Sequence, residues 1–327
     1  MTHLLEVEEL RVDFRTRDGV AQVLNGVSFH VDAGETLALL GESGSGKSVT
    51  AQAIMGILDM PPAEVRSGRI LYQGRDLLTL PAGERREQRG TGIAMVFQGA
   101  LSALNPVFTV GWQIAEALRV RQGMTRSAAM QRAVELMQRV KIPGAESRLQ
   151  DYPHQFSGGM RQRVMIAMAL ALHPKVLIAD EPTTALDVTV QAQIMDLLME
   201  LKDQLGMALI LITHDLGVVA SVADRIAVMY AGRIVEEAGV FDLYRQPAHP
   251  YTRALLESVP RQRDGQPLKS IRGLPPNLLH IPPGCPFHPR CPAELPVCRE
   301  VLPPQVALPG ERCSACHRAR EVFDGSA

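Results

Sequence analysis

Short apolar runs alternate with longer helix-like segments over the first 258 residues. Three of these runs are TLALL (36–40), VLIAD (176–180) and ALILIT (208–213), which are almost entirely apolar. Runs of this length and composition are typical of strands in a mostly parallel sheet that is covered on both faces. Because the segments between them suit helices, the pattern predicts an α/β domain.

The strand-like runs disappear between about residues 102 and 160. The segments WQIAEALRV and RSAAMQRAVELMQRV in this stretch carry apolar residues at helical spacing. Such spacing places the apolar side chains on one face of each helix. We therefore expect a helical subdomain over about residues 102–160, inserted in the α/β domain.

The composition changes near residue 259. Eleven of the 23 prolines lie between residues 275 and 309, and all five cysteines lie between Cys285 and Cys316. Proline and cysteine concentrated in this way are typical of a loop-rich segment with little apolar core. We therefore predict an α/β domain over residues 1–258 and a cysteine-rich and proline-rich extension over residues 259–327.

Charge and hydropathy exclude several classes of protein. The 34 basic and 35 acidic side chains leave a net charge of −1, which gives no basic field for binding nucleic acid. The longest apolar stretch, residues 164–172, is about half as long as a membrane span requires. The first residues, MTHLLEVEEL, lack the basic and apolar regions of a secretory signal. We therefore expect the protein to remain in the cytoplasm.

A glycine-rich loop follows the first apolar run. Residues 41–48 read GESGSGKS, which matches the phosphate-binding pattern G-x-x-x-x-G-K-[ST] between a strand and a helix. Glycine lets backbone N–H groups approach phosphate oxygens, Lys47 reaches the terminal phosphates, and the Ser48 hydroxyl binds Mg²⁺. The predicted nucleotide contacts are Gly41, Glu42, Ser43, Gly44, Ser45, Gly46, Lys47, Ser48 and Val49.

Two carboxylates stand at the end of the apolar run VLIADE. Asp180 and Glu181 follow four apolar residues, where a charge is costly unless it serves a cation or catalysis. We expect Asp180 to hold Mg²⁺, mainly through water. Glu181 is then placed to polarise the water that attacks the γ-phosphate, as a general base.

The run FSGGMRQRVMIAMAL (156–170), directly before VLIADEPTTALD, resembles the signature of ABC-transporter ATPases. The resemblance covers residues 4 to about 257, because the phosphate loop, Gln98, the signature, the acidic strand end, TALD and His214 occur in the family's order. It implies a P-loop NTPase fold with a mostly parallel sheet, an antiparallel β subdomain and a helical insertion. A P-loop kinase or GTPase, the remaining possibility for the loop alone, would lack the signature.

The resemblance implies that the signature serves a second subunit. Ser157, Gly158 and Gly159 offer a hydroxyl and backbone N–H groups at the start of a helix, which is a natural anion site. In the family this segment grips the γ-phosphate bound by the opposite subunit. Asp187 resembles the aspartate that crosses the interface between the two subunits.

Three further roles follow from the resemblance. His214 matches the switch histidine that contacts the γ-phosphate, and Gln98 matches the glutamine that touches Mg²⁺ and the attacking water. Phe14 is placed like the aromatic residue that stacks on adenine. Gly99 and Ala100 depart from the family pattern, which usually has an acidic residue and proline there.

The implied activity is hydrolysis of ATP that powers transport. We expect a second ABC ATPase subunit, identical or paralogous, and two integral membrane permeases. The Gln98 loop and the helices around Trp112 would pass the closing and opening motion of the ATPase subunits to the permeases. The chain would lie peripherally on the cytoplasmic face of the membrane. A soluble ABC ATPase of DNA repair or translation is an alternative, although the coiled coil, tandem ATPase unit or basic surface usual there is absent from the sequence.

The end of the chain indicates which class of ABC transporter the sequence resembles. AHPYTRALLESVP (248–260) and the extension resemble the ATPases of peptide and nickel importers, most closely the dipeptide and oligopeptide ATPases. The cargo would then be a peptide delivered by an extracytoplasmic binding protein, with nickel or a metal chelate as the alternative.

The cysteines predict a metal centre, because disulfides are rare in a reducing cytoplasm and a loop-rich segment gains folding energy from a metal. Both four-cysteine zinc and an iron–sulfur cluster fit this chemistry, and unligated buried cysteines are the third possibility. The family resemblance favours a four-iron four-sulfur cluster, and it implies the ligands Cys285, Cys291, Cys298 and Cys316. Cys313 is then left over.

Overall fold

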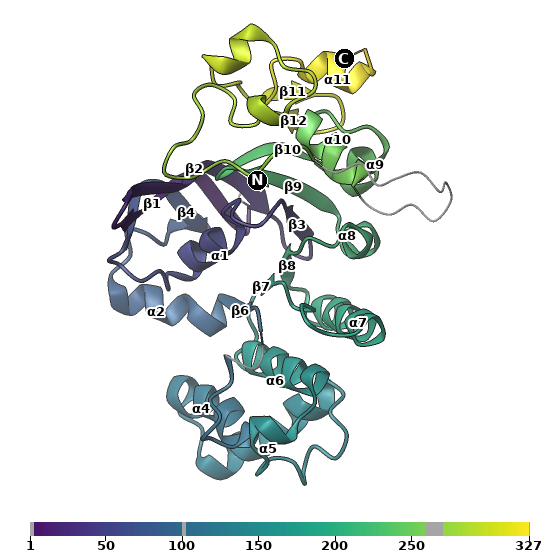
Figure 1. Ribbon diagram of the computed structural model, residues 1–327. Coiled ribbons are helices and arrows are strands. Elements are labelled where there is room, and N and C mark those ends of the chain that lie inside the picture. The colour runs from purple at the N-terminus through teal and green to yellow at the C-terminus, as the bar shows by residue number, and fades with distance from the viewer. Residues whose placement is uncertain (1–2, 100–102, 259–270, 327) are drawn as a thin grey trace. The chain divides into compact units, whose positions relative to one another are not determined.

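A computed structural model describes residues 3–99, 103–258 and 271–326 (Figure 1). The chain divides into two compact units, the first comprising Met1–Asp32, Thr36–Thr79 and Thr213–Ala327, and the second Ala33–Glu35 and Leu80–Ile212. The predicted beginnings of the extension, at residue 259, and of the helical subdomain, near residue 102, lie outside the described residues. Both boundaries remain predictions.

The first unit contains an antiparallel sheet with the strand order β2–β1–β4–β5. Its strands are β1 (Leu5–Thr16), β2 (Gly19–Val31), β4 (Ala63–Tyr72) and β5 (Arg75–Asp76). Leu5 and Val7 on β1 are buried, and a shift in register after Val7 brings Leu10 and Val12 to the buried side as well. The bulge therefore lets both halves of one long strand face the core.

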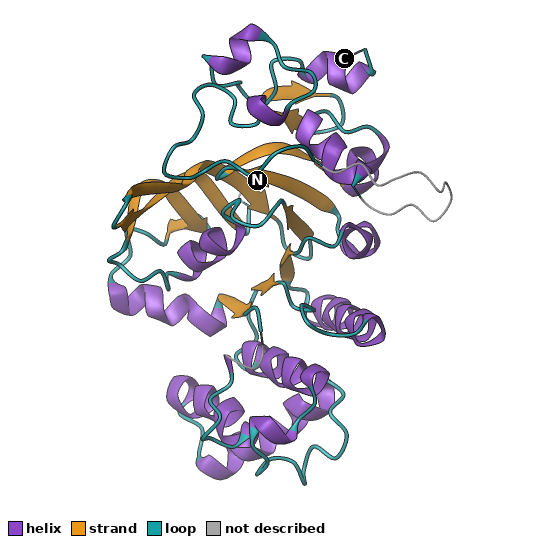
Figure 2. Cartoon of the chain, in the orientation of Figure 1, coloured by secondary structure: helices purple, strands orange, loops and turns teal. Residues whose placement is uncertain are grey.

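A second set of strands in this unit has the order β11–β12–β10–β9–β3. The strands are β3 (Thr36–Leu40), β9 (Arg225–Tyr230), β10 (Arg233–Gly239), β11 (Val306–Leu308) and β12 (Arg312–Ser314). β3 and β9 run parallel, whereas β10 pairs with both β9 and β12 in antiparallel fashion. The cysteine-rich extension therefore adds two strands to this sheet (Figure 2).

Side chains of α8, α9, α10 and the extension pack on the same set of strands. The helices of the first unit are α1 (Lys47–Met55), α8 (Leu216–Val222), α9 (Val240–Arg245), α10 (Pro250–Glu257) and α11 (Ala319–Asp324), with 3₁₀ turns at His288–Arg290 and Pro296–Arg299. Tyr230, Tyr251 and Phe287 meet in the core, with ring centroids 4.6 to 5.3 Å apart. Because Phe287 belongs to the extension and is 1% exposed, the extension shares a core with the strands.

The second unit contains three parallel strands in the order β8–β7–β6 and a group of helices. The strands are β6 (Ile93–Val96), β7 (Val176–Asp180) and β8 (Ala208–Ile212), and the helices are α2 (Ala82–Thr91), α4 (Val110–Gln122), α5 (Arg126–Arg139), α6 (Gly158–Leu170) and α7 (Val188–Leu205), with a 3₁₀ turn at Pro153–Gln155. Every residue of the three strands is buried, as continuous apolar runs require. The predicted strands are confirmed, and α4, α5 and α6 pack together where the sequence predicts helices (Figure 1).

The apolar stretch that begins at Val164 belongs to α6. Its side chains Val164, Ile166 and Leu170 are buried within the protein. Across the three described ranges, no helix combines the length and the hydropathy that a bilayer crossing requires.

A buried histidine joins α10 to the strands beneath it. His249 caps α10, because its Nδ1 accepts a hydrogen bond from the Tyr251 N–H at 3.0 Å. The N–H groups of Ala248 and His249 donate to the buried carboxylate of Glu236 on β10, at 2.6 and 2.9 Å. Burial lowers the pKa of His249 to about 4, so the ring is neutral in the folded protein at pH 7.

Acid should therefore weaken the fold through His249. The ordinary pKa of 6.5 exceeds the folded value of about 4, so the unfolded chain binds the proton first as the pH falls from 6.5 to 4. The loss in free energy of unfolding should be on the order of 2 kcal/mol over that window. Denaturant unfolding of wild type and His249→Asn at several pH values measures it, since asparagine keeps a capping oxygen and does not titrate. Parallel stability curves for the two proteins would contradict the assignment.

Candidate functional site

The phosphate loop packs its backbone directly against a strand of the first unit. Gly41 has φ +153°, and a Cβ there would lie 2.3 Å from the backbone oxygen of Met229 on β9. The Lys47 ammonium group donates to the carbonyl oxygens of Gly41 and Glu42, at 2.8 and 3.1 Å. Gly46 precedes α1 with a left-handed φ of 105°, so that the loop turns into the helix. The loop is therefore held by backbone contacts at both ends, and its role as a phosphate cradle remains a prediction.

A hydrogen-bonded carboxylate stands at the end of β7 in the second unit. The Gln98 amide nitrogen donates to Glu181 Oε2 at 2.7 Å, and the Thr184 hydroxyl donates to the same oxygen at 2.9 Å. Asp180, the last residue of β7, is 3% exposed. Although Gln98 and Glu181 are 83 residues apart, the parallel pairing of β6 with β7 brings the ends of both strands to the same edge.

Glu181 also has an unusual backbone conformation. Its φ is +45°, in the left-handed region that residues other than glycine rarely adopt. Holding such a residue there costs on the order of 1 kcal/mol, and strain of this kind is concentrated at functional sites. The Glu181 N–H donates to the Ile212 carbonyl at 2.8 Å, which ties the strained residue to β8.

The signature run begins at the N-terminus of α6 and continues along the helix. Ser157 is the N-cap residue, and its hydroxyl accepts a hydrogen bond from the Met160 N–H at 3.3 Å. Asp187 caps α7 in the same way through the Val190 N–H, at 2.9 Å. A Cβ at Gly159 would lie 2.6 Å from Cγ1 of Val190, so the two helix starts pack closely at that glycine.

The remaining predicted residues are divided between the two units. Phe14 is a half-buried residue of β1, paired with Ala21 and Ala63, and His214 lies between β8 and α8 in the first unit. Trp112 is half-buried on α4 in the second unit and stacks on Phe108, with ring centroids 4.1 Å apart. The assigned roles of all these residues remain predictions.

Four of the five cysteines gather in the extension. Burial and then the neighbouring cysteines raise the pKa of Cys285 to about 12, and the same two causes raise the pKa of Cys316 to about 11. Cys291 and Cys298 belong to the same group, since both act on Cys285 and on Cys316. Cys313 lies elsewhere, on β12 opposite Glu237 of β10, and its pKa is raised to about 11 by burial and by that carboxylate.

Backbone donors point at three of these sulfurs. Cys285, Cys291 and Cys316 each accept a hydrogen bond from the N–H of the residue two positions further along the chain. The Arg318 N–H is 3.4 Å from the sulfur of Cys316. Donors arranged in this way stabilise a thiolate, which is the form of cysteine that binds metals.

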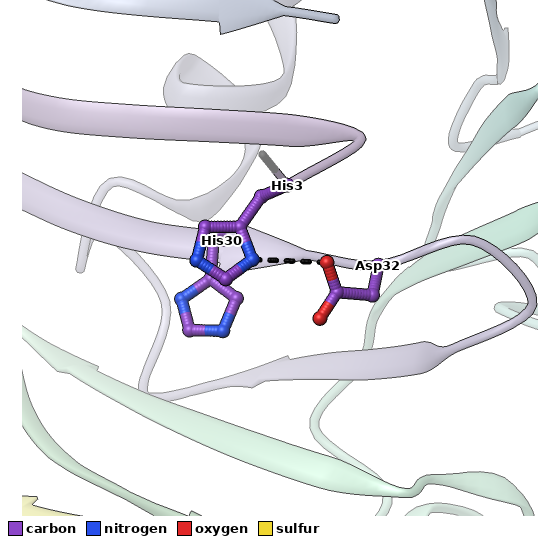
Figure 3. Close-up of side chains that lie close together, drawn as sticks. All are labelled: His3, His30 and Asp32. Atoms are coloured by element: carbon purple, nitrogen blue, oxygen red, sulfur yellow. Dashed lines mark hydrogen bonds and ion pairs between the residues drawn. The ribbon is translucent and has the colours of Figure 1, made fainter. Parts of the chain in front are cut away.

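A second group of possible metal ligands lies where β1 begins and β2 ends (Figure 3). His3 Nδ1 is 2.9 Å from Asp32 Oδ1, and the His3 ring stacks on His30 with centroids 3.7 Å and planes 26° apart. A metal binds imidazole nitrogen in the plane of the ring, so stacked rings would have to rotate before both could reach one ion at about 2.1 Å. Burial, and next the charge of Arg225, lower the pKa of His30 to about 4. The group is therefore a stacked pair with a hydrogen bond to Asp32.

The sequence did not reveal three residues that contact the predicted site. Thr184 orients Glu181, while Tyr251 and Arg290 contact Glu42 of the phosphate loop. Arg290 is 248 residues from Glu42 along the chain, so no local pattern links them. The sequence does carry a signal for Thr184, because it begins the TALD motif and stands three residues after Glu181.

Comparison with known proteins identifies two regions of this chain. Residues 24–184 match the ABC transporter family, and residues 235–298 match the C-terminal region of oligopeptide/dipeptide transporters. The chain is 50% identical to the probable peptide ABC transporter ATP-binding protein y4tR of Sinorhizobium fredii, over 98% of this chain and 96% of that protein. It is 52% identical to the dipeptide transport ATP-binding protein DppD of Bacillus subtilis, over 93% and 91% of the two chains. Identity to the oligopeptide transport ATP-binding protein OppD of Salmonella typhimurium is 50%, over 97% and 94%.

Solved structures show the same fold. The dimeric post-hydrolysis structure of the ATP-binding cassette MJ0796 with ADP and Pi has a TM-score of 0.64 at 27% identity, and covers 72% of this chain and 98% of that one. CbiO1 of Clostridium perfringens, part of the ABC transporter complex cbiONQ, has a TM-score of 0.62 at 31% identity, covering 75% and 92%. The predicted fold class is therefore confirmed.

The close contact at Gly159 yields a prediction about stability. Gly159→Ala should lower the free energy of unfolding by about 1–3 kcal/mol, because the new methyl group would overlap Val190, whose side chain is stiff in a helix. Gly158→Ala is the matched control, since its Cβ would lie 3.3 Å from Leu186 and requires only a small shift. Urea unfolding measures both variants. Adding Val190→Ala should restore part of the lost free energy of unfolding. If it restores none, the overlap with Val190 is not the cause of the loss.

Proposed function

Because this chain belongs to the ABC transporter family of ATP-binding proteins, we propose that it is the ATP-hydrolysing subunit of an importer for di- or oligopeptides. The family couples hydrolysis of ATP to transport, and this chain carries its ATPase unit. The observation that carries the peptide assignment is the extent of the likeness. Three proteins named for peptide transport share about half of their residues with 93–98% of this chain, including the extension. This favours peptides over the nickel, metal-chelate and non-transport alternatives.

Residues of both units take part in the proposed hydrolysis of ATP. The phosphate loop binds ATP, with Lys47 directed to the terminal phosphates. Ser48, Gln98 and Asp180 would hold Mg²⁺, which would neutralise phosphate charge when bound. Glu181 acts as general base toward the attacking water. The donors Gln98 and Thr184 on Glu181 Oε2 support this role, because two hydrogen bonds fix the rotation of the carboxylate.

A second ABC ATPase subunit completes the site. The N-terminal turn of α6, with Ser157, Gly158 and Gly159, offers N–H groups to the γ-phosphate held by that partner. Its close packing on α7 at Gly159 supports this role, since a rigid turn presents its donors without rearrangement. Asp187 crosses the interface between the two subunits, His214 contacts the γ-phosphate, and Phe14 stacks on the adenine.

An exposed apolar surface on the second unit suits contact with two membrane permeases. Val107 is 70% exposed and Phe108 is 40% exposed, and Phe108 stacks on Trp112. The buried Gln113 side chain holds this turn through hydrogen bonds to both backbone groups of Asn105 and to the Phe108 carbonyl, all at 2.9 Å. The chain would lie on the cytoplasmic face of the membrane, and an extracytoplasmic binding protein would deliver the cargo.

The gathered cysteines support a four-iron four-sulfur cluster bound by Cys285, Cys291, Cys298 and Cys316. Four thiolates also suit a tetrahedral zinc site. The N–H groups directed at three sulfurs suit either metal centre, and the family resemblance favours the cluster.

Replacing Glu181 by Gln tests the ATPase assignment in the complex reconstituted with its membrane subunits. The variant should retain ATP binding and lose hydrolysis by about 10²- to 10⁴-fold, because the amide cannot accept the proton. ATP-driven uptake of a labelled peptide into vesicles should stop in parallel. Glu135→Gln, an exposed glutamate of α5, is the control and should leave both rates unchanged. If hydrolysis survives in Glu181→Gln, another group is the base.

Anaerobic purification tests the cysteine centre. The wild-type protein should be brown and carry about four iron and four sulfide per chain, by metal analysis and absorbance. Cys298→Ser should lose most of this iron, whereas Cys313→Ser, with its side chain on β12, should keep it. A colourless protein without iron would remove the cluster, and zinc in its place would support the zinc centre.

A further inference from the structure

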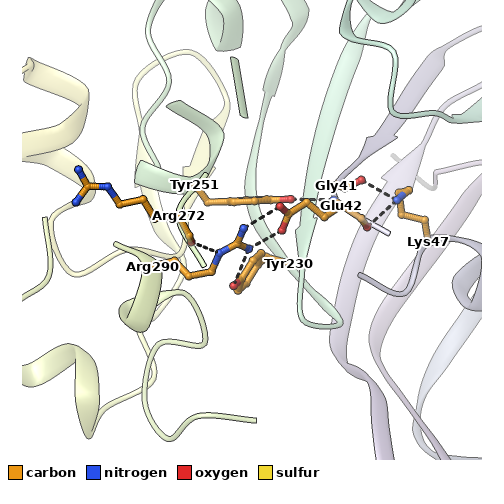
Figure 4. A network of polar contacts seen from close by, with 7 residues as sticks. All are labelled: Gly41, Glu42, Lys47, Tyr230, Tyr251, Arg272 and Arg290. Atoms are coloured by element: carbon orange, nitrogen blue, oxygen red, sulfur yellow. Dashed lines mark hydrogen bonds and ion pairs between the residues drawn. The ribbon is translucent and has the colours of Figure 1, made fainter. Parts of the chain in front are cut away.

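One side chain of the extension reaches the phosphate loop (Figure 4). Arg290 Nη1 is 2.6 Å from Glu42 Oε2, and Arg290 Nη2 is 2.9 Å from Glu42 Oε1. These parallel contacts form a bidentate ion pair, the strongest arrangement of a guanidinium and a carboxylate. Glu42 is the first residue after Gly41 in the phosphate-binding motif.

The Arg290 side chain is fixed on all sides. It is 5% exposed, and it donates from Nε to the Arg272 carbonyl at 2.9 Å and from Nη1 to the Tyr230 hydroxyl at 3.3 Å. The guanidinium carbon also lies 5.8 Å from the centre of the Tyr230 ring. A buried charge that loses its partner is strongly unfavourable, so the extension can hold Arg290 here only if Glu42 remains opposite it.

Glu42 is restrained through its backbone as well. Its N–H donates to the Tyr251 hydroxyl at 2.9 Å, and its carbonyl accepts hydrogen bonds from the Lys47 ammonium group at 3.1 Å and from the Ser45 N–H at 3.2 Å. The side chain, the N–H and the carbonyl of one residue are therefore each bound to a different partner. Because Lys47 shares that carbonyl, the position of Glu42 influences the residue that reaches the terminal phosphates.

The position of Arg290 depends on the cysteine-bearing segment. Arg290 ends the turn His288–Arg290, directly before Cys291 and five residues after Cys285. Phe287 in the same turn packs on Tyr230 and Tyr251, which are the two tyrosines that contact Arg290 and Glu42. The fold of this segment therefore sets where the guanidinium lies.

We propose that Arg290 is a positioning residue for the phosphate loop, through which the cysteine-bearing extension sets the affinity of this subunit for ATP. Arg290 acts through Glu42, and Glu42 holds the loop and Lys47 in the shape that binds phosphate. The inference rests on the proposed function, because it assumes that the loop binds ATP.

Calorimetric titration of the full-length chain with ATP and Mg²⁺ tests the inference. Arg290→Gln and Glu42→Gln should each weaken ATP binding roughly five- to twentyfold, and the double variant should bind within about twofold of the weaker single variant, since both changes break one interaction. In the reconstituted complex, Arg290→Gln should raise the KM for ATP by a similar factor and change kcat less than about threefold. Arg290→Lys should recover only part of the affinity, because an ammonium group cannot form the bidentate pair.

Arg299→Gln is the matched control. Arg299 also pairs with a carboxylate in the extension, Glu294, at 2.8 Å, but its side chain is 68% exposed. It should bind ATP like the wild type. Unchanged affinity in Glu42→Gln, additive losses in the double variant, or an equal loss in Arg299→Gln would overturn the inference. A wild-type chain that binds no ATP would instead overturn the proposed function. Should Arg290→Gln fail to fold, Glu42→Gln and Arg290→Lys still decide the question.

Discussion

The phosphate loop depends on one close approach between backbones. The Met229 carbonyl oxygen on β9 occupies the place where a side chain at position 41 would begin, so only glycine allows the loop to rest on that strand. The loop is then connected to its surroundings by further backbone contacts, such as the hydrogen bond from the Gly232 N–H to the Ser45 carbonyl at 2.9 Å. A loop held in this way needs little rearrangement to bind an anion, which is the physical basis of a preformed phosphate site.

β9 also connects the loop to the cysteine-rich extension. It pairs with β3, which leads into the loop, and with β10, whose outer edge receives β12 of the extension. Two side chains of the extension strengthen this connection. Phe287 packs on Tyr230 of β9, and Arg290 pairs with Glu42 of the loop. The extension is therefore part of the packing around the nucleotide loop, and not only a segment that follows the ATPase domain in sequence.

Three buried charged side chains of the first unit lie at this junction. Glu236 and Arg312 are nearly inaccessible to water, and Glu236 accepts hydrogen bonds from two backbone N–H groups. Arg290 is buried against Glu42. Burying such groups costs several kcal/mol each unless partners compensate, and replacement by apolar side chains is often neutral for stability. These charges specify the arrangement of the chain. Each one is compensated only when the segments that carry its partners lie in a single arrangement.

The sequence by itself determined the strands at 36–40 and 176–180, the helices after them, the phosphate loop and the family, because these depend on local patterns and on the order of short motifs. It also placed Asp180 and Glu181 at a strand end. It could not show that Gln98 orients Glu181, that four cysteines gather while Cys313 lies on a strand, or that Arg290 holds Glu42. Those contacts join residues far apart in the chain, and only the pairing of strands and the burial of side chains decide which distant residues meet.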